Sequence, residues 1–138
     1  MMNRRDIFKT LAGMLAAVPL RAQGRQPRSS ILLQESPLAG TQYYEAQRQW
    51  SQLKIGAPVR LVRAPANPYD PLAVEVWHGD AMLGHLPSDE NIVVAQMLDR
   101  GERLNARIAA LCKSPDPWER IRVQIHLDAS KPSGQGEA

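Results

Sequence analysis

Residues 59–86 read VRLVRAPANPYDPLAVEVWHGDAMLGHL, and this stretch decides the fold. It contains three apolar runs rich in β-branched residues, as short strands do. The runs cover residues 59–62, 72–76 and 82–86. A proline-rich corner separates the first two runs, and a turn at Gly79-Asp80 separates the last two. We therefore expect consecutive short strands and a small, mostly β protein.

The corner, residues 64–71, reads APANPYDP. Its three prolines preset much of the backbone, so its side chains are held on a stiff support. Tyr69 and Asp70 lie at its tip. An exposed Asp70 would be free to contact a ligand, but Asn-Pro-x-Asp sequences also favour an Asx-turn, in which the carboxylate accepts backbone amides. The two roles are compatible, and both stay open.

The same periodicity arguments assign the other elements of the chain. Strands are predicted at residues 30–34, 57–64, 72–77, 81–86, 104–111 and 120–127. Helices are predicted at residues 41–53, with Thr41 as a possible cap, and from Pro87 to about Asp99. The apolar face of the second helix should cover one end of the β-structure.

The ends of the chain differ in composition from its centre. Residues 1–22 read MMNRRDIFKTLAGMLAAVPLRA, with a basic start, a short apolar run and a small residue at the end, as in a secretory signal. The paired arginines resemble a twin-arginine motif, so we expect export to the periplasm, with a cytoplasmic location if the leader does not function. The apolar run is too short for a stable membrane span. Residues 23–29 are predicted to be a linker and residues 128–138 a disordered tail, which leaves residues 30–127 as the domain.

Charge and cysteine content narrow the possible functions. The formal net charge is +3, but residues 23–138 carry 13 basic and 13 acidic side chains. A broad basic face for nucleic acid is therefore not predicted, and any such binding needs a local pocket. The single cysteine, Cys112, cannot form an internal disulfide, and no Cys/His cluster has zinc spacing. We expect no metal and no cofactor.

The string LVRAPANPYDPLAVEV from Leu61, followed by MLGHLP and a helix ending in LDRG, resembles the HIRAN domain. The resemblance extends from about Leu38 to about Ile125. It implies a small closed β-barrel, related to OB and SH3-like barrels, with one or two covering helices. It also implies a module that captures the 3′ end of single-stranded DNA, as HIRAN domains do in fork-remodelling translocases.

The resemblance gives candidate roles to several aromatic and acidic residues. Bases stack on exposed aromatic rings, which makes Tyr43, Tyr44 and Tyr69 candidate contacts. Neighbouring residues cannot both point inward, so at least one of Tyr43 and Tyr44 should be exposed. By resemblance, Tyr69 and Asp70 recognise the terminal nucleotide, where a carboxylate accepts a 3′ hydroxyl and repels an internal phosphate. Trp118 is a further stacking candidate, or alternatively seals the end of the barrel.

Basic residues are few near this group. Arg63 precedes the corner and is the best-placed partner for a phosphate. His85 could contact a phosphate or a base, or could pack beside a turn with backbone hydrogen bonds. DNA-binding members carry basic residues where this chain has Gln42 and Ser88, and the loss should weaken affinity.

Enzymatic motifs are not found in the sequence. It has no nucleophile elbow, no glycine-rich phosphate loop and no H-E-x-x-H. Two hypotheses remain. The first is a non-catalytic module for single-stranded DNA ends, and the second is an exported barrel that uses the same corner to bind a peptide, a glycan or an envelope protein.

Overall fold

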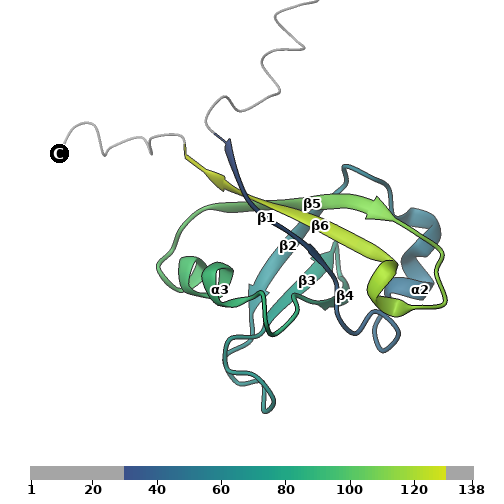
Figure 1. Cartoon of the computed structure of the whole chain (residues 1–138), viewed down its shortest axis with the longest axis horizontal. Helices are drawn as coiled ribbons and strands as arrows, with labels where there is room; N and C mark the ends of the chain where they lie inside the picture. The colour runs from purple at the N-terminus through teal and green to yellow at the C-terminus, as the bar shows by residue number, and fades with distance from the viewer. Residues whose placement is uncertain (1–29, 130–138) are drawn as a thin grey trace, which may run out of the picture. The chain divides into compact units, whose positions relative to one another are not determined.

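The structure, a computed structural model, describes residues 30–129. Within that range the chain is mostly β, with short helices (Figure 1). The elements in order are β1 (Ser30–Pro37), α2 (Ala46–Gln49), the 3₁₀ turn η1 (Trp50–Gln52), β2 (Pro58–Arg63), β3 (Val74–His78), β4 (Ala81–His85), α3 (Ile92–Asp99), β5 (Leu104–Leu111), the 3₁₀ turn η2 (Pro117–Glu119) and β6 (Ile121–Asp128). The predicted succession of strands and helices is confirmed.

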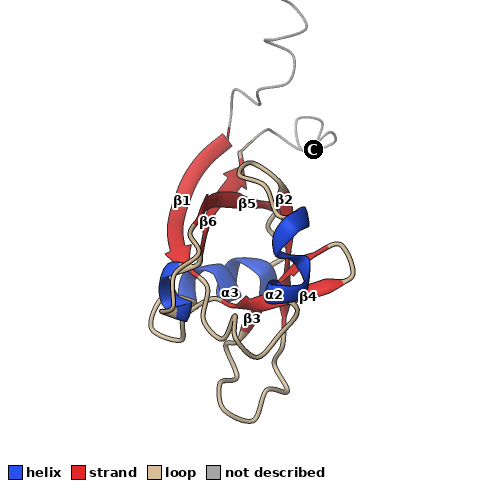
Figure 2. Ribbon diagram, turned by 90° about the vertical axis from the view of Figure 1, so that its right-hand side faces the viewer, coloured by secondary structure: helices blue, strands red, loops and turns tan. Residues whose placement is uncertain are grey.

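The strands form a single antiparallel sheet in the order β1-β6-β5-β2-β3-β4. The sheet curves so that its two edge strands approach each other (Figure 2). The fold is OB-like as expected, but the sheet is not closed into a barrel. In the described residues, its edges are joined by an isolated bridge between Ala39, just after β1, and His85, at the end of β4.

The seam between the edge strands is short because the chain turns away after Ala39. Two backbone hydrogen bonds form the bridge: the Ala39 amide donates to the His85 carbonyl at 2.8 Å, and the His85 amide donates to the Ala39 carbonyl at 2.9 Å. Gly40 then adopts a φ of 77°, which favours glycine and ends the pairing. Gly84 permits the close approach, since a Cβ there would lie 2.5 Å from the Ala39 oxygen.

The core lies inside the curve of the sheet and follows the alternation of the strands. Its fully buried side chains include Val74, Val76, Leu83, Ile121, Val123 and Ile125. The helix α3 lies between the β5 side and the β3 side of the sheet, at one end of the molecule (Figures 1 and 2). It buries Val94 and Ala95 and leaves Ile92 and Val93 half exposed, so it covers one end of the β-structure as expected.

The boundaries of several elements differ from the prediction, and β1, expected to end at Gln34, continues to Pro37. The helix expected at residues 41–53 is only α2 followed by η1. The Thr41 hydroxyl donates to the Pro117 carbonyl instead of capping a helix, and the Glu45 amide donates to the Met82 carbonyl of β4. The third strand begins at Val74, since Leu72 and Ala73 bond back to Asp70. The second helix begins at Ile92, after a separate turn at residues 87–90.

The terminal segments are outside the described residues. These are the expected leader (1–22), the linker (23–29) and all but the start of the tail (128–138), although Asp128 itself belongs to β6. No helix within residues 30–129 combines the length and hydropathy needed to cross a bilayer.

Candidate functional site

The proline corner between β2 and β3 is organised by the side chain of Asn67. Its Oδ1 atom accepts hydrogen bonds from the backbone amides of Tyr69 at 2.8 Å and Asp70 at 3.2 Å. The Ala73 amide donates to the Asp70 carbonyl and closes the turn. The Tyr69 side chain is held outside this turn, with 94% of its surface exposed. Tyr69 is thus the most exposed large hydrophobic side chain of the described domain.

Asp70 joins the corner to the start of α3. Its Oδ1 accepts the Leu72 amide at 2.9 Å, which is the Asx-turn considered from the sequence. Its Oδ2 accepts the Nδ2 of Asn91 at 2.7 Å. A carboxylate has about four lone-pair sites, so each oxygen can accept a further hydrogen bond from a ligand. The structural role of Asp70 is therefore compatible with ligand contact.

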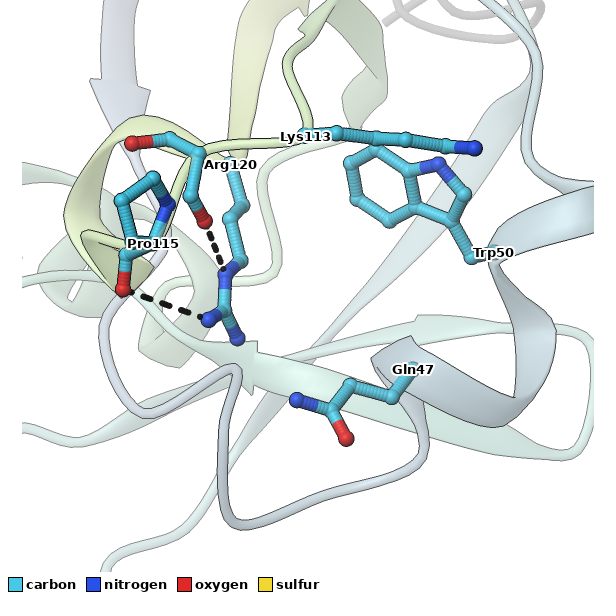
Figure 3. A pocket seen from close by; sticks show the side chains of 6 residues that line it. Gln47, Trp50, Lys113, Pro115 and Arg120 are labelled. Atoms are coloured by element: carbon cyan, nitrogen blue, oxygen red, sulfur yellow. Dashed lines mark hydrogen bonds between the residues drawn. The ribbon is translucent and has the colours of Figure 1, made fainter.

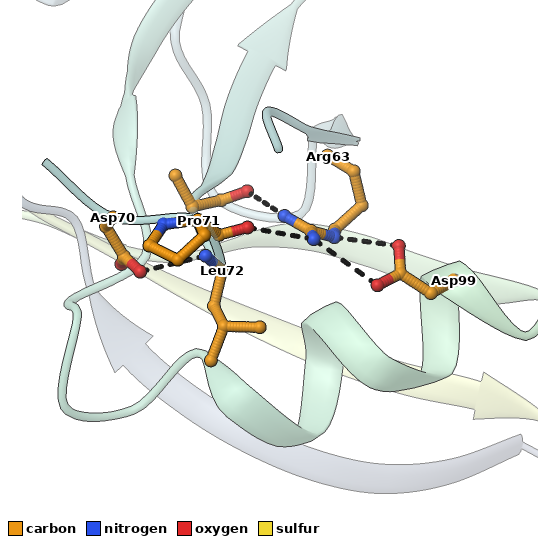
Figure 4. A network of polar contacts seen from close by, with 6 residues as sticks. Arg63, Asp70, Pro71, Leu72 and Asp99 are labelled. Atoms are coloured by element: carbon orange, nitrogen blue, oxygen red, sulfur yellow. Dashed lines mark hydrogen bonds and ion pairs between the residues drawn. The ribbon is translucent and has the colours of Figure 1, made fainter. Parts of the chain in front are cut away.

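The guanidinium group of Arg63 lies between the corner and Asp99 (Figure 4). All three guanidinium nitrogens donate: Nη1 to the Ala73 carbonyl at 2.8 Å, Nη2 to the Pro71 carbonyl at 3.0 Å, and Nε to the Asp99 carboxylate at 2.9 Å. The Arg63 side chain retains only 15% of its exposed surface. The structure thus gives Arg63 a set of intramolecular partners, with no phosphate needed to neutralise its charge.

His85 occupies the seam where the edges of the sheet meet. It lies opposite Glu75 in the antiparallel pairing of β3 and β4, and its ring centroid lies 5.3 Å from that of Tyr44. Its Nε2 is buried and has no hydrogen-bond partner among the described residues. Burial lowers the pKa of His85, against the opposing effect of the Glu75 and Asp70 charges. The imidazole is therefore mainly neutral at pH 7.

The turn at residues 40–44 positions the other two tyrosines. The Tyr43 amide donates to the Gly40 carbonyl, and a Cβ at Gly40 would lie 3.1 Å from the Tyr44 ring. Tyr43 is 79% exposed and Tyr44 is 39% exposed. At least one of the two was expected at the surface, and both lie there.

Trp118 belongs to η2, in the segment between β5 and β6. Its amide donates to the Asp116 carboxylate, and the Pro117 carbonyl before it accepts the Thr41 hydroxyl at 3.2 Å. This bond ties η2 to the tyrosine turn. The Trp118 side chain is 52% exposed, so its ring is available at the surface and does not fully seal the end of the sheet.

Sequence reasoning missed two residues that hold the corner in place. Asn91 is 1% exposed and connects α3 to Asp70, while Asp99 at the end of α3 pairs with Arg63. Asn91 precedes an apolar helix, and that position indicates an N-cap, but its side chain makes no capping bond. Only the packing of α3 against the corner reveals both roles.

The described domain carries little net charge to attract phosphates. Residues 30–129 contain ten basic and twelve acidic side chains. Within this range, no group of three or more His, Cys, Asp and Glu side chains is placed to hold a metal ion. The site therefore offers exposed rings, one carboxylate and one neutral imidazole, which suit stacking and hydrogen bonding.

One comparison with known proteins identifies a family, and another finds similar folds. The family model of the HIRAN domain matches residues 31–130. A crystal structure of a protein from Lactobacillus plantarum aligns with a TM-score of 0.63 and 25% identity, over 71% of this chain and 94% of that one. The crystal structure of the HIRAN domain of human HLTF aligns with a TM-score of 0.52 and 20% identity, over 72% of this chain and 77% of that one. No curated protein has significant sequence similarity to the chain.

Proposed function

The chain belongs to the HIRAN domain family, a family of nucleic-acid-binding modules, and from this premise we propose that it binds the 3′ end of single-stranded DNA without catalysing a reaction. The contacts in this proposal come from Tyr69, Asp70 and His85, with Tyr43, Tyr44 and Trp118 beside them.

The observation that carries the proposal is the exposure of Tyr69 on a braced corner. A ring that is 94% exposed contributes little to folding, yet Asn67 fixes the backbone beneath it. Stacking of a base on such a ring is worth about 1 to 3 kcal/mol. Since the support is already rigid, little conformational entropy is lost on binding.

Selectivity for an end follows from the chemistry of Asp70 and His85. A 3′ hydroxyl can donate to the Asp70 carboxylate, whereas a phosphate at the same place is repelled by it. The buried His85 Nε2 lacks a partner, and a ligand hydroxyl would supply one. Because this nitrogen is covered, a neighbouring side chain must shift first, and the partly exposed Tyr44 ring is the neighbour in contact with His85.

Arg63 has a positioning role in this proposal. Its bonds to Pro71, Ala73 and Asp99 hold the residues that follow Asp70, so it orients the carboxylate. Phosphate attraction is weak, since acidic side chains outnumber basic ones in residues 30–129. Stacking should therefore contribute more to the affinity than phosphate contacts do, and the affinity should depend only weakly on ionic strength.

We further propose that the protein is exported, on the leader pattern of residues 1–22. Chromosomal DNA ends are not expected in the periplasm, so export favours the second candidate function, in which the corner binds a peptide, a glycan or an envelope protein. Fusing residues 1–30 to a reporter that is active only after export tests this point. A reporter that stays inactive would overturn export and remove the main argument for the second candidate.

Fluorescence anisotropy with labelled oligonucleotides tests the DNA-end proposal. Residues 23–138 are titrated with otherwise identical strands of about ten nucleotides, within the range of about 4 to 16 that one OB fold covers, that carry a free or a phosphorylated 3′ end. We expect tighter binding to the free end, and a loss of about 5- to 150-fold for Tyr69→Ala, from its stacking energy.

Tyr69→Phe is the matched control, because it keeps the aromatic face and should bind nearly as well as the unmodified protein. Binding that ignores both the state of the 3′ end and the Tyr69→Ala substitution would overturn the proposal.

A further inference from the structure

A cavity lies outside the group of residues described above. It has a volume of about 380 Å³ and lies between the α2–η1 segment and the connection from β5 to β6 (Figure 3). Its lining residues are Gln47, Trp50, Lys113, Ser114, Pro115 and Arg120. Figure 3 shows Lys113 extended beside the Trp50 indole on one side, with Arg120 and Pro115 on the other.

The cavity is positively charged although the domain as a whole is not. Lys113 and Arg120 take part in no ion pair among the described residues, whereas Arg63 and Arg122 each pair with a carboxylate. No carboxylate lines the cavity. The adjacent acid, Glu119, accepts the Ser114 hydroxyl at 2.7 Å. These two cations are therefore available to an anionic ligand.

Arg120 is held in place by backbone carbonyls and keeps an unused donor. Its Nε donates to the Ser114 carbonyl at 2.9 Å, and its Nη2 donates to the Pro115 carbonyl at 3.4 Å. Its Nη1 is buried and has no acceptor within residues 30–129. A buried donor without a partner is unfavourable, so a ligand oxygen that reached it would gain a hydrogen bond. In Figure 3 the guanidinium of Arg120 and the exposed side chain of Gln47 both border the cavity.

The cavity adjoins the aromatic residues of the first site. Trp118 lies in the same β5–β6 connection as Lys113 and Arg120, and the preceding Pro117 is bonded to Thr41 in the tyrosine turn. Gln47, at the edge of the cavity, follows Tyr44 by only three residues. The cavity is therefore connected to the segments that carry Tyr44 and Trp118.

We propose that this cavity is a second subsite for the same strand, in which an internal phosphodiester lies between Lys113 and Arg120. The proposal rests on the proposed function. The partly exposed indole of Trp50 supplies an apolar face for the base beside that phosphate. The first site distinguishes a free from a phosphorylated 3′ end, and the second binds the DNA strand through one phosphate contact.

Lys113→Gln tests the subsite, since the Lys113 side chain is exposed and makes no hydrogen bond or ion pair within the described residues. Arg107→Gln is the matched control: it removes the same charge from β5, six residues away and about 20 Å along an extended strand at about 3.3 Å per residue. Thermal unfolding should be unchanged in both variants.

Two oligonucleotides with free 3′ ends separate the two sites. One of about three nucleotides fills only the end site, and one of about ten nucleotides reaches the cavity. We expect Lys113→Gln to leave the Kd of the short strand unchanged and to weaken the long strand by about five- to tenfold at about 50 mM salt. The slope of log K against log salt should decrease by about 0.7 for the long strand, the value for one lost phosphate contact in single strands.

The possible failures are distinguishable. If the long strand binds Lys113→Gln and Arg107→Gln equally well, while Tyr69→Ala still weakens the short strand, the subsite is overturned and the end-binding function stands. If the unmodified protein binds neither strand, the proposed function fails and the subsite with it.

Discussion

The Nδ2 atom of Asn91 donates to the Oδ2 atom of Asp70 over 2.7 Å, and this bond connects the first residue before α3 to the tip of the proline corner. Asn91 is almost completely buried, so the bond is shielded from water. The position of the Asp70 carboxylate is therefore determined by a residue on another element, and the corner and α3 form one unit.

Replacing Asn91 by alanine should destabilise the domain measurably. The variant leaves one Asp70 oxygen without its buried donor, and hydrogen bonds to charged groups contribute about 1.5 to 3 kcal/mol. We expect the free energy of unfolding in urea to fall by about 1 to 3 kcal/mol. Asn105→Ala, at an exposed position of β5, is the control and should change it by less than about 0.5 kcal/mol. Equal effects of the two substitutions would show that the Asp70 contact is not important for stability.

Arg63→Lys should affect stability rather than the salt dependence of binding. Lysine keeps the charge but cannot reach Pro71, Ala73 and Asp99 together, so the free energy of unfolding should fall by about 1 to 3 kcal/mol. Asp99→Asn should cost less than about 1 kcal/mol, because the Asp99 side chain is 53% exposed. Tighter DNA binding by Asp99→Asn would instead indicate that a released Arg63 contacts phosphate.

Discrimination between free and phosphorylated 3′ ends should depend on pH through His85. Burial lowers the pKa of this imidazole below its usual 6.5, so it is mainly neutral above that pH and becomes charged as the pH falls further. An imidazolium attracts phosphate, and we expect the preference for the free end to be largest above pH 6.5 and to shrink several-fold toward pH 5. Anisotropy titrations at both pH values measure the ratio.

His126→Gln is the control for the pH experiment. His126 lies on β6, and its pKa is also lowered, by burial and by the charge of Arg107. Its pKa shift therefore has the same direction as that of His85. The pH dependence should persist in His126→Gln and be reduced in His85→Gln, where the second ionisation of the 3′ phosphate, with a pKa of about 6, still contributes. The opposite pattern would remove His85 from the site.

Trp118→Ala should weaken strand binding with little change in stability. Half of the ring is exposed, and loss of one stacking surface costs about 1 to 3 kcal/mol of binding free energy, or about 5- to 150-fold in Kd. Trp118→Phe should recover most of the affinity. If Trp118→Ala instead lowers the melting temperature by many degrees and leaves Kd unchanged, the ring has a packing role, the alternative considered from the sequence.

Gly84→Ala should open the seam of the sheet. The new methyl group would lie 2.5 Å from the Ala39 oxygen, so the bridge to His85 cannot keep its geometry. Overpacking of this kind costs about 1 to 3 kcal/mol. Hydrogen exchange should become faster at the amides of Ala39 and His85. Gly79→Ala, with no atom within 4 Å of the added carbon but a φ of 58°, controls for backbone strain and should leave both amides protected.

The local sequence was sufficient to predict most of the fold. Alternating apolar residues located the strands, and the Gly79 turn and the proline corner separated them. Closure of the barrel was predicted wrongly, because it depends on how two edge strands meet. Gly40 and Gly84 decide that geometry through a positive φ and a close backbone contact, which no periodicity reveals.

The candidate site was less predictable than the fold. Exposure of Tyr69 followed from its place at the corner, and exposure of at least one of Tyr43 and Tyr44 followed from their being neighbours in the sequence. The partners of Arg63 and Asp70 did not, since Asp99 and Asn91 are 36 and 21 residues away along the chain. The cavity with Lys113 and Arg120 likewise needs α2, η1 and the β5–β6 connection to come together.

In the proposed function, the backbone and the side chain of His85 have different roles. Its backbone joins the two edges of the sheet, and its ring is the group that a strand end would contact. Occupancy of the ring and separation of the edges are thus linked equilibria. Because such coupling is reciprocal, a change that separates the two edge strands of the sheet weakens DNA binding. Bound DNA opposes that separation by the same factor. A bound DNA end would then stabilise the contact between the two edge strands of the sheet.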